Sequence, residues 1–254
     1  MLRSAVVVDE IVALASLKGV AAAELDGAIA LLAPHLGVYA ELVVTAAGIE
    51  IITGGVGNAT ARDLARIATV AGARTCDAFL ACTERFPDRM LGLKLCFGAA
   101  ASFPTLYLRT LAPRADVLSF VATLPDHAGA VPALSLALAG NEVLYGLGFS
   151  TTAAGQPLLK TYSLDDVSAL GSHAMPGFVS FRAMGAAVAR EVKRYLPDLA
   201  WSELPDGFGY EQVRALVGCE RVGHLGVVES PGVAPQVKLY LERVGAVASD
   251  FSLR

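Results

Sequence analysis

Three short segments of the chain repeat one alternating pattern, and this pattern constrains the fold more than any other feature. Each segment begins with proline and reads as a β-strand: Pro104–Leu111, Pro157–Leu164 and Pro235–Arg243. In a strand, successive side chains point to opposite faces. Each strand would therefore carry a cation and a tyrosine on one face, and in Pro104–Leu111 and Pro235–Arg243 the other face is mainly apolar. The pairs are Tyr107 and Arg109, Lys160 and Tyr162, and Lys238 and Tyr240.

Each of these segments is expected to be the second strand of a β-hairpin, because a shorter alternating run and a turn precede it. Four hairpins are predicted: Val38–Thr45 with Gly48–Gly54, Met90–Gly98 with Pro104–Leu111, Glu142–Ser150 with Pro157–Ser163, and Val222–Glu229 with Gln236–Arg243. Apolar residues at helical spacing predict the helices. These are Ser4–Leu17, Ala21–Leu36, Asn58–Ala71, Asp77–Arg85, Arg114–Leu124, Val131–Ala139, Leu164–Leu170, Phe181–Leu196 and Tyr210–Val217.

The order helix, helix, strand, strand repeats four times, with a period of roughly 50 to 65 residues. The fold class predicted is α+β, built from repeated ααββ units. No low-complexity linker separates two halves, so we expect one domain over residues 1–254. Hairpins that pair edge to edge can close into an antiparallel β-barrel, which removes the exposed strand edges. The helices would then surround the barrel.

The polar strand faces have two interpretations. On an open sheet they would be ordinary solvent-exposed surface, because half-buried strands alternate in any case. Inside a helix-covered barrel they would line the lumen, where Lys and Arg are costly unless paired. Several converging cations with too few carboxylates would then indicate an anionic guest such as a phosphate or diphosphate. Lys94, on the strand before Tyr107, adds a further cation to this face.

Composition excludes several other classes of protein. The chain has 254 residues, 54% of them hydrophobic, but its most apolar region is interrupted by Pro125, Asp126 and Pro132, so no membrane span is expected. A net charge of −4 without a basic run argues against a nucleic-acid partner. The four cysteines have no paired spacing, and reduced thiols in a cytoplasmic protein fit them better than disulfides or zinc.

At these strands the chain resembles the aromatic prenyltransferases of the ABBA type, also called PT-barrel enzymes. The motifs that carry the resemblance are Lys160-Thr-Tyr162, Lys238-Leu-Tyr240 and Tyr107-Leu-Arg109. The resemblance implies that Lys94, Arg109, Lys160 and Lys238 bind the diphosphate of dimethylallyl or a longer prenyl diphosphate. It implies that Tyr107, Tyr162 and Tyr240 shield the allylic carbocation with their π-faces. An aromatic acceptor, either a small molecule or a peptide side chain, would take the prenyl group.

The resemblance also implies a glutamate that orients the acceptor and receives its proton. Glu41, on the first strand, is the matching residue, and Glu50, on the second strand, is its competitor. A buried carboxylate has the raised basicity that this role needs. No metal site is expected, since no Asp-Asp-x-x-Asp motif occurs and the histidines are scattered. No cofactor is required on this interpretation, although Mg²⁺ can accompany a diphosphate.

Two departures leave alternatives open. Members of the family commonly have five hairpins, while four are predicted here, and members are usually longer than this chain. Either a pair is hidden near Phe178–Met184 or around Trp201, or the barrel is incomplete, as a compact form near the cyanobactin peptide prenyltransferases would allow. The alternative functions are a non-catalytic barrel that binds an anionic small molecule and an open-sheet interaction domain.

Overall fold

The computed structural model describes residues 2–32, 40–46, 48–54, 60–86, 90–98, 104–152, 154–164, 175–204, 209–217, 221–230 and 232–243. Its helices are α1 (Leu2–Leu17), α2 (Ala22–Leu32), α3 (Ala61–Val70), α4 (Cys76–Arg85), α5 (Arg114–Ala122), η2 (Ala128–Ala130), α6 (Val131–Ala137), η4 (Trp201–Glu203) and α7 (Tyr210–Val217). Its strands are β1 (Ala40–Val44), β2 (Gly48–Gly54), β3 (Leu91–Gly98), β4 (Thr105–Pro113), β5 (Val143–Thr151), β6 (Pro157–Leu164), β7 (Met175–Met184), β8 (Ala187–Ala200), β9 (Arg221–Ser230) and β10 (Val233–Arg243).

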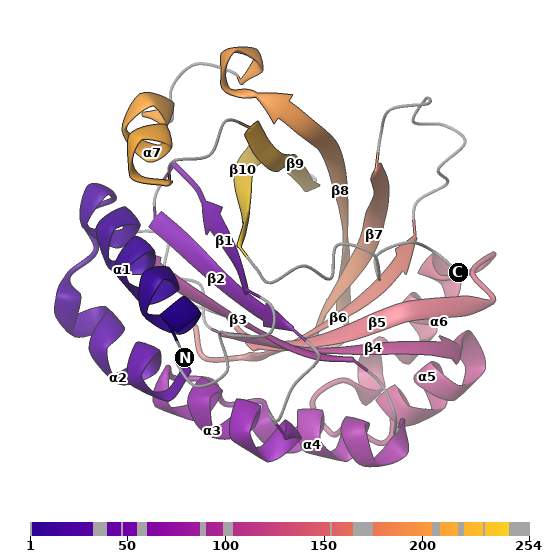
Figure 1. The fold of residues 1–254 in the computed structure, drawn as a ribbon. Helices are drawn as coiled ribbons and strands as arrows, with labels where there is room; N and C mark the ends of the chain where they lie inside the picture. Colours follow the sequence, from indigo (N-terminus) through magenta and orange to yellow (C-terminus); the bar gives the residue numbers. More distant parts are fainter. Residues whose placement is uncertain are drawn as a thin grey trace.

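The ten described strands form one closed antiparallel barrel in the order β1-β10-β9-β8-β7-β6-β5-β4-β3-β2 (Figure 1). Every strand pairs with its neighbour in sequence, and β1 closes the ring by pairing with β10. The predicted fold class, repeated ααββ units around a central antiparallel barrel, is confirmed. The four predicted hairpins are also confirmed, with ends that differ by three residues or fewer.

The predicted helix Phe181–Leu196 is wrong. Its residues belong to a fifth hairpin, β7 and β8, which turns at Gly185 with φ 56°. The segment misleads because it is rich in alanine and spaces Val188 and Val192 four residues apart, as a helix would. The hairpin lies where a hidden pair was suspected, and it completes the barrel. Of the predicted helix Leu164–Leu170, the first residue ends β6 and the rest lies outside the described residues.

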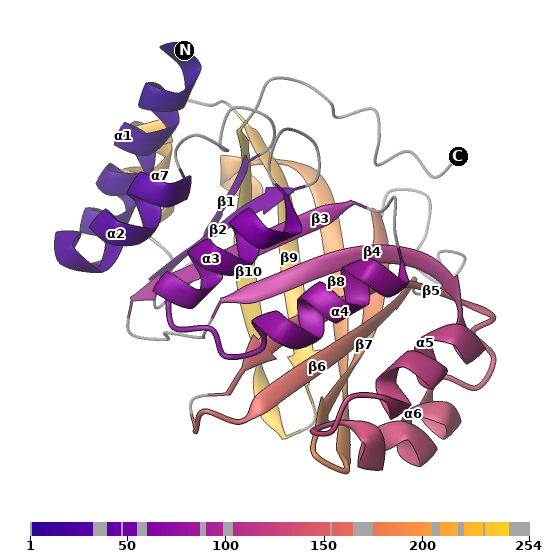
Figure 2. The same cartoon turned by 90° about the horizontal axis from the view of Figure 1, so that it is seen from below.

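The helices lie on the outside of the barrel and bury its apolar strand faces. Helix α3 contacts β3 and β4, α4 contacts β4 and β5, and α6 contacts β7 and β8, while α1 packs on α2, α7 and β2 (Figure 2). The leucines of the outward faces, such as Leu93 and Leu108, are almost completely buried. Phe79 of α4 packs edge-on against Phe149 of β5, with ring centroids 6.1 Å apart. Burial of this face forces the opposite, polar face of each strand into the lumen.

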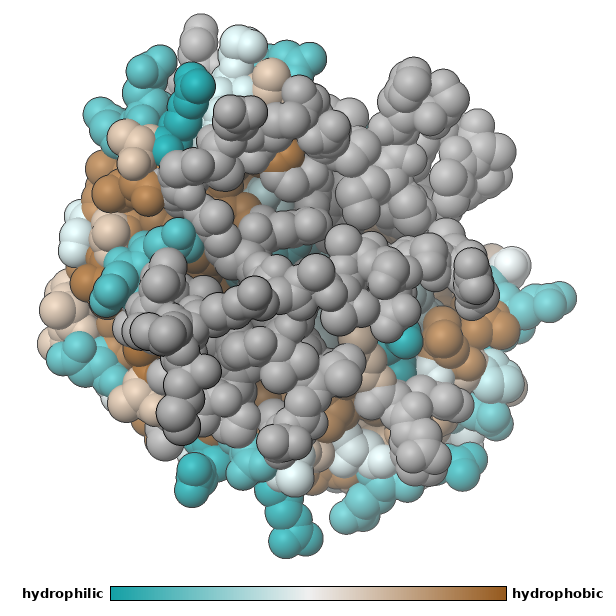
Figure 3. Space-filling view, viewed as in Figure 1, coloured by the Kyte–Doolittle hydropathy of each residue, from teal (hydrophilic) through white to brown (hydrophobic). Residues whose placement is uncertain are grey.

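Outside the core, the helices present polar side chains to water. Hydrophilic residues gather along the edge formed by α3 and α4 (Figure 3). Helix α3 begins at a capping box in which the Thr60 hydroxyl accepts from the Asp63 N–H and the Asp63 carboxylate accepts from the Thr60 N–H. None of the described helices combines the length and the apolar character that crossing a membrane requires.

Candidate active site in the barrel lumen

The lumen contains a cavity of about 940 Å³ that all ten strands help to enclose. Side chains from the inward face of each strand line it. All nine residues predicted for the site are among them: Glu41, Glu50, Lys94, Tyr107, Arg109, Lys160, Tyr162, Lys238 and Tyr240. The sequence pattern thus brought together residues that lie up to 199 positions apart, from Glu41 to Tyr240. Their chemical roles are not tested by this placement and stay predictions.

The charged residues of the lumen are not balanced. Six cationic side chains line the cavity against three carboxylates. The cations are Lys94, Arg109, Lys160, Arg182, Lys193 and Lys238, and the carboxylates are Glu41, Glu50 and Glu191. An excess of buried positive charge destabilises an empty site, because charge that has left water must be paired. The described lumen therefore favours an anionic ligand.

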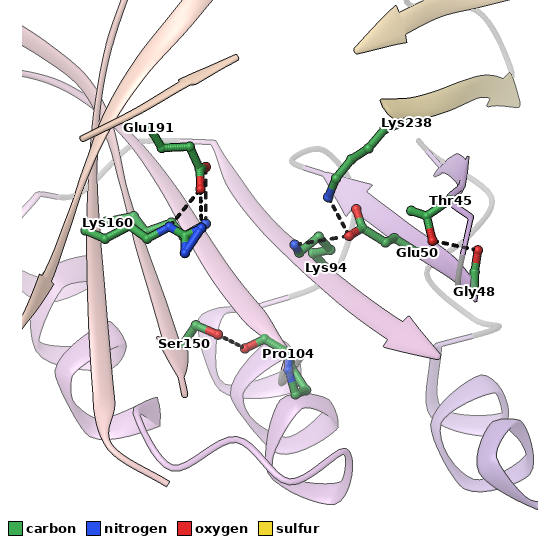
Figure 4. A network of polar contacts seen from close by, with 10 residues as sticks. Thr45, Gly48, Glu50, Lys94, Pro104, Ser150, Lys160, Glu191 and Lys238 are labelled. Atoms are coloured by element: carbon green, nitrogen blue, oxygen red, sulfur yellow. Dashed lines mark hydrogen bonds and ion pairs between the residues drawn. The ribbon is translucent and has the colours of Figure 1, made fainter. Parts of the chain in front are cut away.

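Glu50 forms the first of two charged clusters, with Lys94 and Lys238 (the Glu50 cluster). The Lys238 Nζ donates a hydrogen bond of 2.6 Å to Glu50 Oε1, and the Lys94 Nζ lies 3.6 Å from the same oxygen (Figure 4). Burial alone would raise the pKa of Glu50, but the two lysines outweigh burial and lower the pKa to about 2. The expectation of raised basicity is therefore wrong for Glu50, which is a poor proton acceptor at neutral pH.

Glu191 on β8 forms the second cluster, with Lys160 and Arg182 (the Glu191 cluster). Its Oε2 accepts from Arg182 Nε at 2.7 Å and lies 2.5 Å from Arg182 Nη2, while its Oε1 is 3.5 Å from Lys160 Nζ. Burial lowers the pKa of Lys160 to about 8, although Glu191 opposes that shift. Figure 4 shows Lys160 and Glu191 on one side of the lumen and the Glu50 cluster on the other.

Tyr240 and Lys193, which both line the cavity, form a cation–π pair. The Lys193 Nζ lies 4.4 Å from the centroid of the Tyr240 ring. Burial and the charge of Lys238 lower the pKa of Lys193 to about 7, and the charge of Glu41 opposes them. The ring fits because residue 226 is glycine: a Cβ there would lie 2.7 Å from Tyr240 Cε2. One face of Tyr240 is thus already occupied by an amino group.

Tyr107 and Tyr162 form an aromatic wall with Phe178. The rings of Tyr107 and Tyr162 lie 5.9 Å apart, and those of Tyr162 and Phe178 lie 6.4 Å apart at 87°. Gly148 makes room for the two tyrosines, because a Cβ at that position would come within 3.1 Å of Tyr162 and 3.3 Å of Tyr107. This wall presents π-faces and edges next to the cations, which suits a ligand that carries both an apolar chain and an anionic head.

The sequence reading missed Arg182, Glu191 and Lys193, because it assigned their segment to a helix. One signal could have revealed them. Lys193 and Tyr195 repeat the Lys-x-Tyr spacing of the other strands, and Ser180, Arg182 and Met184 alternate with apolar residues. Recognition of this pattern would have supplied both the missing hairpin and the second carboxylate cluster.

No group of three or more His, Cys, Asp or Glu side chains within the described ranges is arranged to hold a metal ion. The cysteines in those ranges, Cys76, Cys82 and Cys96, are free thiols. Arg109 lines the cavity and has no ion pair with another described residue.

Comparison with known proteins identifies the fold. No protein-family model matches the sequence, and no curated protein is similar to it in sequence. The structure is similar to 5-dimethylallyltryptophan synthase from Streptomyces coelicolor, with a TM-score of 0.63, 14% identity and 99% of both chains covered. It is also similar to the prenyltransferase PriB in complex with L-tryptophan and dimethylallyl thiolodiphosphate (TM-score 0.64, 14% identity, 94% of this chain and 95% of PriB).

A third similar structure is NotF prenyltransferase, with a TM-score of 0.61, 9% identity and 91% of this chain and 92% of that chain covered. The likeness extends over almost the full length of each protein. The chain therefore has the ABBA-type prenyltransferase fold, as its repeated hairpins indicated.

Proposed function

We propose that the chain transfers a prenyl group from an allylic isoprenoid diphosphate to an aromatic acceptor, inside the barrel lumen. One observation carries the proposal: a cavity inside the barrel in which six cationic side chains adjoin a wall of tyrosines. The excess of cationic side chains over carboxylates suits a diphosphate head, and the aromatic wall suits an apolar prenyl chain. The fold shared with known prenyltransferases supports the same conclusion.

In this proposal the donor diphosphate lies among Lys94, Arg109, Lys160 and Lys238. The allylic C–O bond breaks, and its electron pair leaves with the diphosphate, whose developing charge these cations stabilise. Tyr107 and Tyr162 face the allylic cation that remains. While it carries its proton, the Lys193 amino group on one face of Tyr240 repels an allylic cation on that same face.

The aromatic acceptor attacks the allylic carbon, a new bond to the prenyl group forms, and the ring then loses a proton. Of the two predicted carboxylates, Glu41 is assigned as the proton acceptor, because its competitor Glu50 is held ionised by two lysines. Glu41 lines the cavity on β1 and is only 7% exposed. Glu50 instead positions Lys94 and Lys238 for the diphosphate.

Tryptophan and related indoles are the first acceptors to test, because two of the similar structures are a dimethylallyltryptophan synthase and a tryptophan complex. The assay combines the protein with dimethylallyl or geranyl diphosphate and a panel of indoles and phenols, with and without EDTA. We expect a product heavier than the acceptor by one prenyl group, formed without added metal because lysine and arginine supply the positive charge.

The matched variants are Lys238→Ala in the lumen and Arg194→Ala on the outer face, where Arg194 pairs with Glu229. The lumen variant should lose at least about tenfold in kcat/KM, since it removes a cation from the leaving group, while the outer variant should not. Saturable diphosphate binding without product from any acceptor would instead identify a binding protein. Equal activity of all three proteins would place the chemistry outside the lumen.

A further inference from the structure

Glu191 occupies a position in the lumen that an anionic ligand would be expected to take. Its two oxygens lie between Lys160 and Arg182, at 3.5 Å from Lys160 Nζ and 2.7 Å from Arg182 Nε, and Ser180 Oγ lies 3.4 Å from Oε1. These are the donor types with which proteins bind phosphate oxygens, and the Arg182 distance is that of a charge-assisted hydrogen bond. Both cations line the cavity, and so does Glu191 itself.

The carboxylate is charged in this position. Burial opposes its ionisation, but Lys160 and Arg182 outweigh burial and hold the pKa of Glu191 below its ordinary value. Glu191 is 8% exposed, so solvent screens its charge poorly. A diphosphate that approached Lys160 would therefore meet a fixed negative charge that already satisfies the cations.

We propose that Glu191 is an internal counter-ion of the empty lumen, and that a bound diphosphate displaces it from Lys160 and Arg182. The inference rests on the proposed function only in assuming that the anion enters this part of the lumen. Glu191 keeps the cations ordered and paired when no ligand is present, and its repulsion of the ligand limits affinity and favours release of the diphosphate product.

The geometry explains how the displacement can occur. Arg182 is the most exposed member of the cluster, with a side chain 37% exposed, whereas the side chains of Lys160 and Glu191 are 14% and 10% exposed. When Glu191 leaves the cluster, Arg182 can therefore turn toward solvent or stay and share the ligand with Lys160. The Glu50 cluster differs here: its three side chains are all between 10% and 13% exposed, so it is the more rigid of the two.

The test measures the affinity of inorganic pyrophosphate by calorimetry at pH 6.5, where Lys160 keeps its proton. Glu191→Gln keeps the shape of the side chain and removes the charge. We expect it to bind pyrophosphate roughly tenfold more tightly than the unmodified protein, the effect of one screened charge–charge interaction. Glu229→Gln is the matched control, because Glu229 forms a similar cross-strand pair with Arg194 on the outer face and should leave the affinity unchanged.

Equal or weaker binding by Glu191→Gln would overturn the inference, and weaker binding would show that Glu191 positions the cations instead. Absence of pyrophosphate binding by both proteins would overturn it as well. If Glu191→Gln does not fold, a crystal structure of the unmodified protein with pyrophosphate decides: Glu191 must lie beyond 4.0 Å, the limit of an ion pair, from both cations. Tighter binding by the variant without prenyl transfer by either protein would uphold the counter-ion and refute the proposed function.

Discussion

Lys160 loses its positive charge at a lower pH than an ordinary lysine, because burial lowers its pKa to about 8. Below that pH it is a cation next to the aromatic wall, and above it the amino group is neutral. A guanidinium, in contrast to a lysine amino group, does not lose its proton in proteins. The positive charge of the lumen therefore has a part that changes with pH, from lysine, and a part that does not, from arginine.

This difference predicts a pH dependence of anion binding. The affinity for pyrophosphate should fall as the pH rises through about 8, because Lys160 then loses the charge that attracts the ligand. The Lys160→Arg variant should lose much less affinity over the same pH range. Dividing the pyrophosphate affinity of the unmodified protein by that of the variant at each pH cancels the titration of pyrophosphate itself. Calorimetry between about pH 6.5 and pH 9.5 measures the pyrophosphate affinity of both proteins on either side of the Lys160 pKa. A ratio that does not change with pH would contradict the assignment of Lys160 to the anion site.

Gly226 gives a second prediction at the scale of one residue. Gly226→Ala places a Cβ 2.7 Å from Tyr240 Cε2 and 3.5 Å from Lys193 Cε, so the ring and the amino group must move. We expect kcat/KM for prenyl transfer to fall by about tenfold or more, because a small displacement of groups around the reacting carbon is costly.

The control for Gly226 is Gly27→Ala in α2, whose new Cβ would meet only Val70 Cγ1 at 3.9 Å and should leave activity unchanged. Circular dichroism confirms that both variants fold. Unchanged activity of Gly226→Ala would show that the position of Tyr240 does not matter for the reaction.

At the scale of elements, the hairpins that carry Lys-x-Tyr or Tyr-x-Arg were predictable and the fifth hairpin was not. Strands β4 and β10 alternate with leucines on the outward face, and β6 keeps Lys160 and Tyr162 on one face, so periodicity assigns them. Strand β8 instead begins with Ala-Val-Ala-Arg, in which the helix propensity of alanine competes with the alternating pattern of a strand. Pairing with β7 and β9 makes this segment a strand. Propensity is a weak prior that tertiary pairing overrides.

The β7–β8 turn can be tested directly. Gly185 has φ 56° and an ideal Cβ there would meet no atom within 4 Å, so any cost of a side chain is purely one of backbone conformation. Gly185→Ala should lower the free energy of unfolding by about 1 kcal/mol, measured by urea denaturation. Gly185→Asn should cost less, because asparagine tolerates this left-handed conformation. Equal free energies of unfolding for the unmodified protein, Gly185→Ala and Gly185→Asn would contradict the left-handed conformation of Gly185.

At the scale of the whole molecule, two opposed faces organise the structure. The outward strand faces join the helices in one apolar core that includes Phe79, Phe149 and Leu108, and the inward faces hold the charges. The alternation predicted which side chains share a face, and closure of the barrel was expected because it removes strand edges. The ion pairs could not be predicted, since Lys238 and Glu50 are 188 residues apart and meet only across the lumen.

The barrel also predicts how ligand and stability are linked. Pyrophosphate should raise the melting temperature, because it binds the folded lumen and relieves the repulsion among six cations. Added sodium chloride should weaken this stabilisation, since salt screens the attraction between ligand and lumen. Differential scanning fluorimetry at low and high salt measures the effect. Stabilisation that does not depend on salt would contradict an electrostatic site.

In the proposed complex, the lumen binds the diphosphate between its cationic side chains and the prenyl chain against the aromatic wall. A crystal structure with dimethylallyl thiolodiphosphate tests it most directly, because the sulfur and phosphorus atoms locate the ligand. We expect phosphate oxygens within hydrogen-bonding distance of Lys160 and Lys238, and the allyl group against Tyr107 and Tyr162. A ligand bound on the outer helices, or with its prenyl chain directed away from both tyrosines, would contradict it.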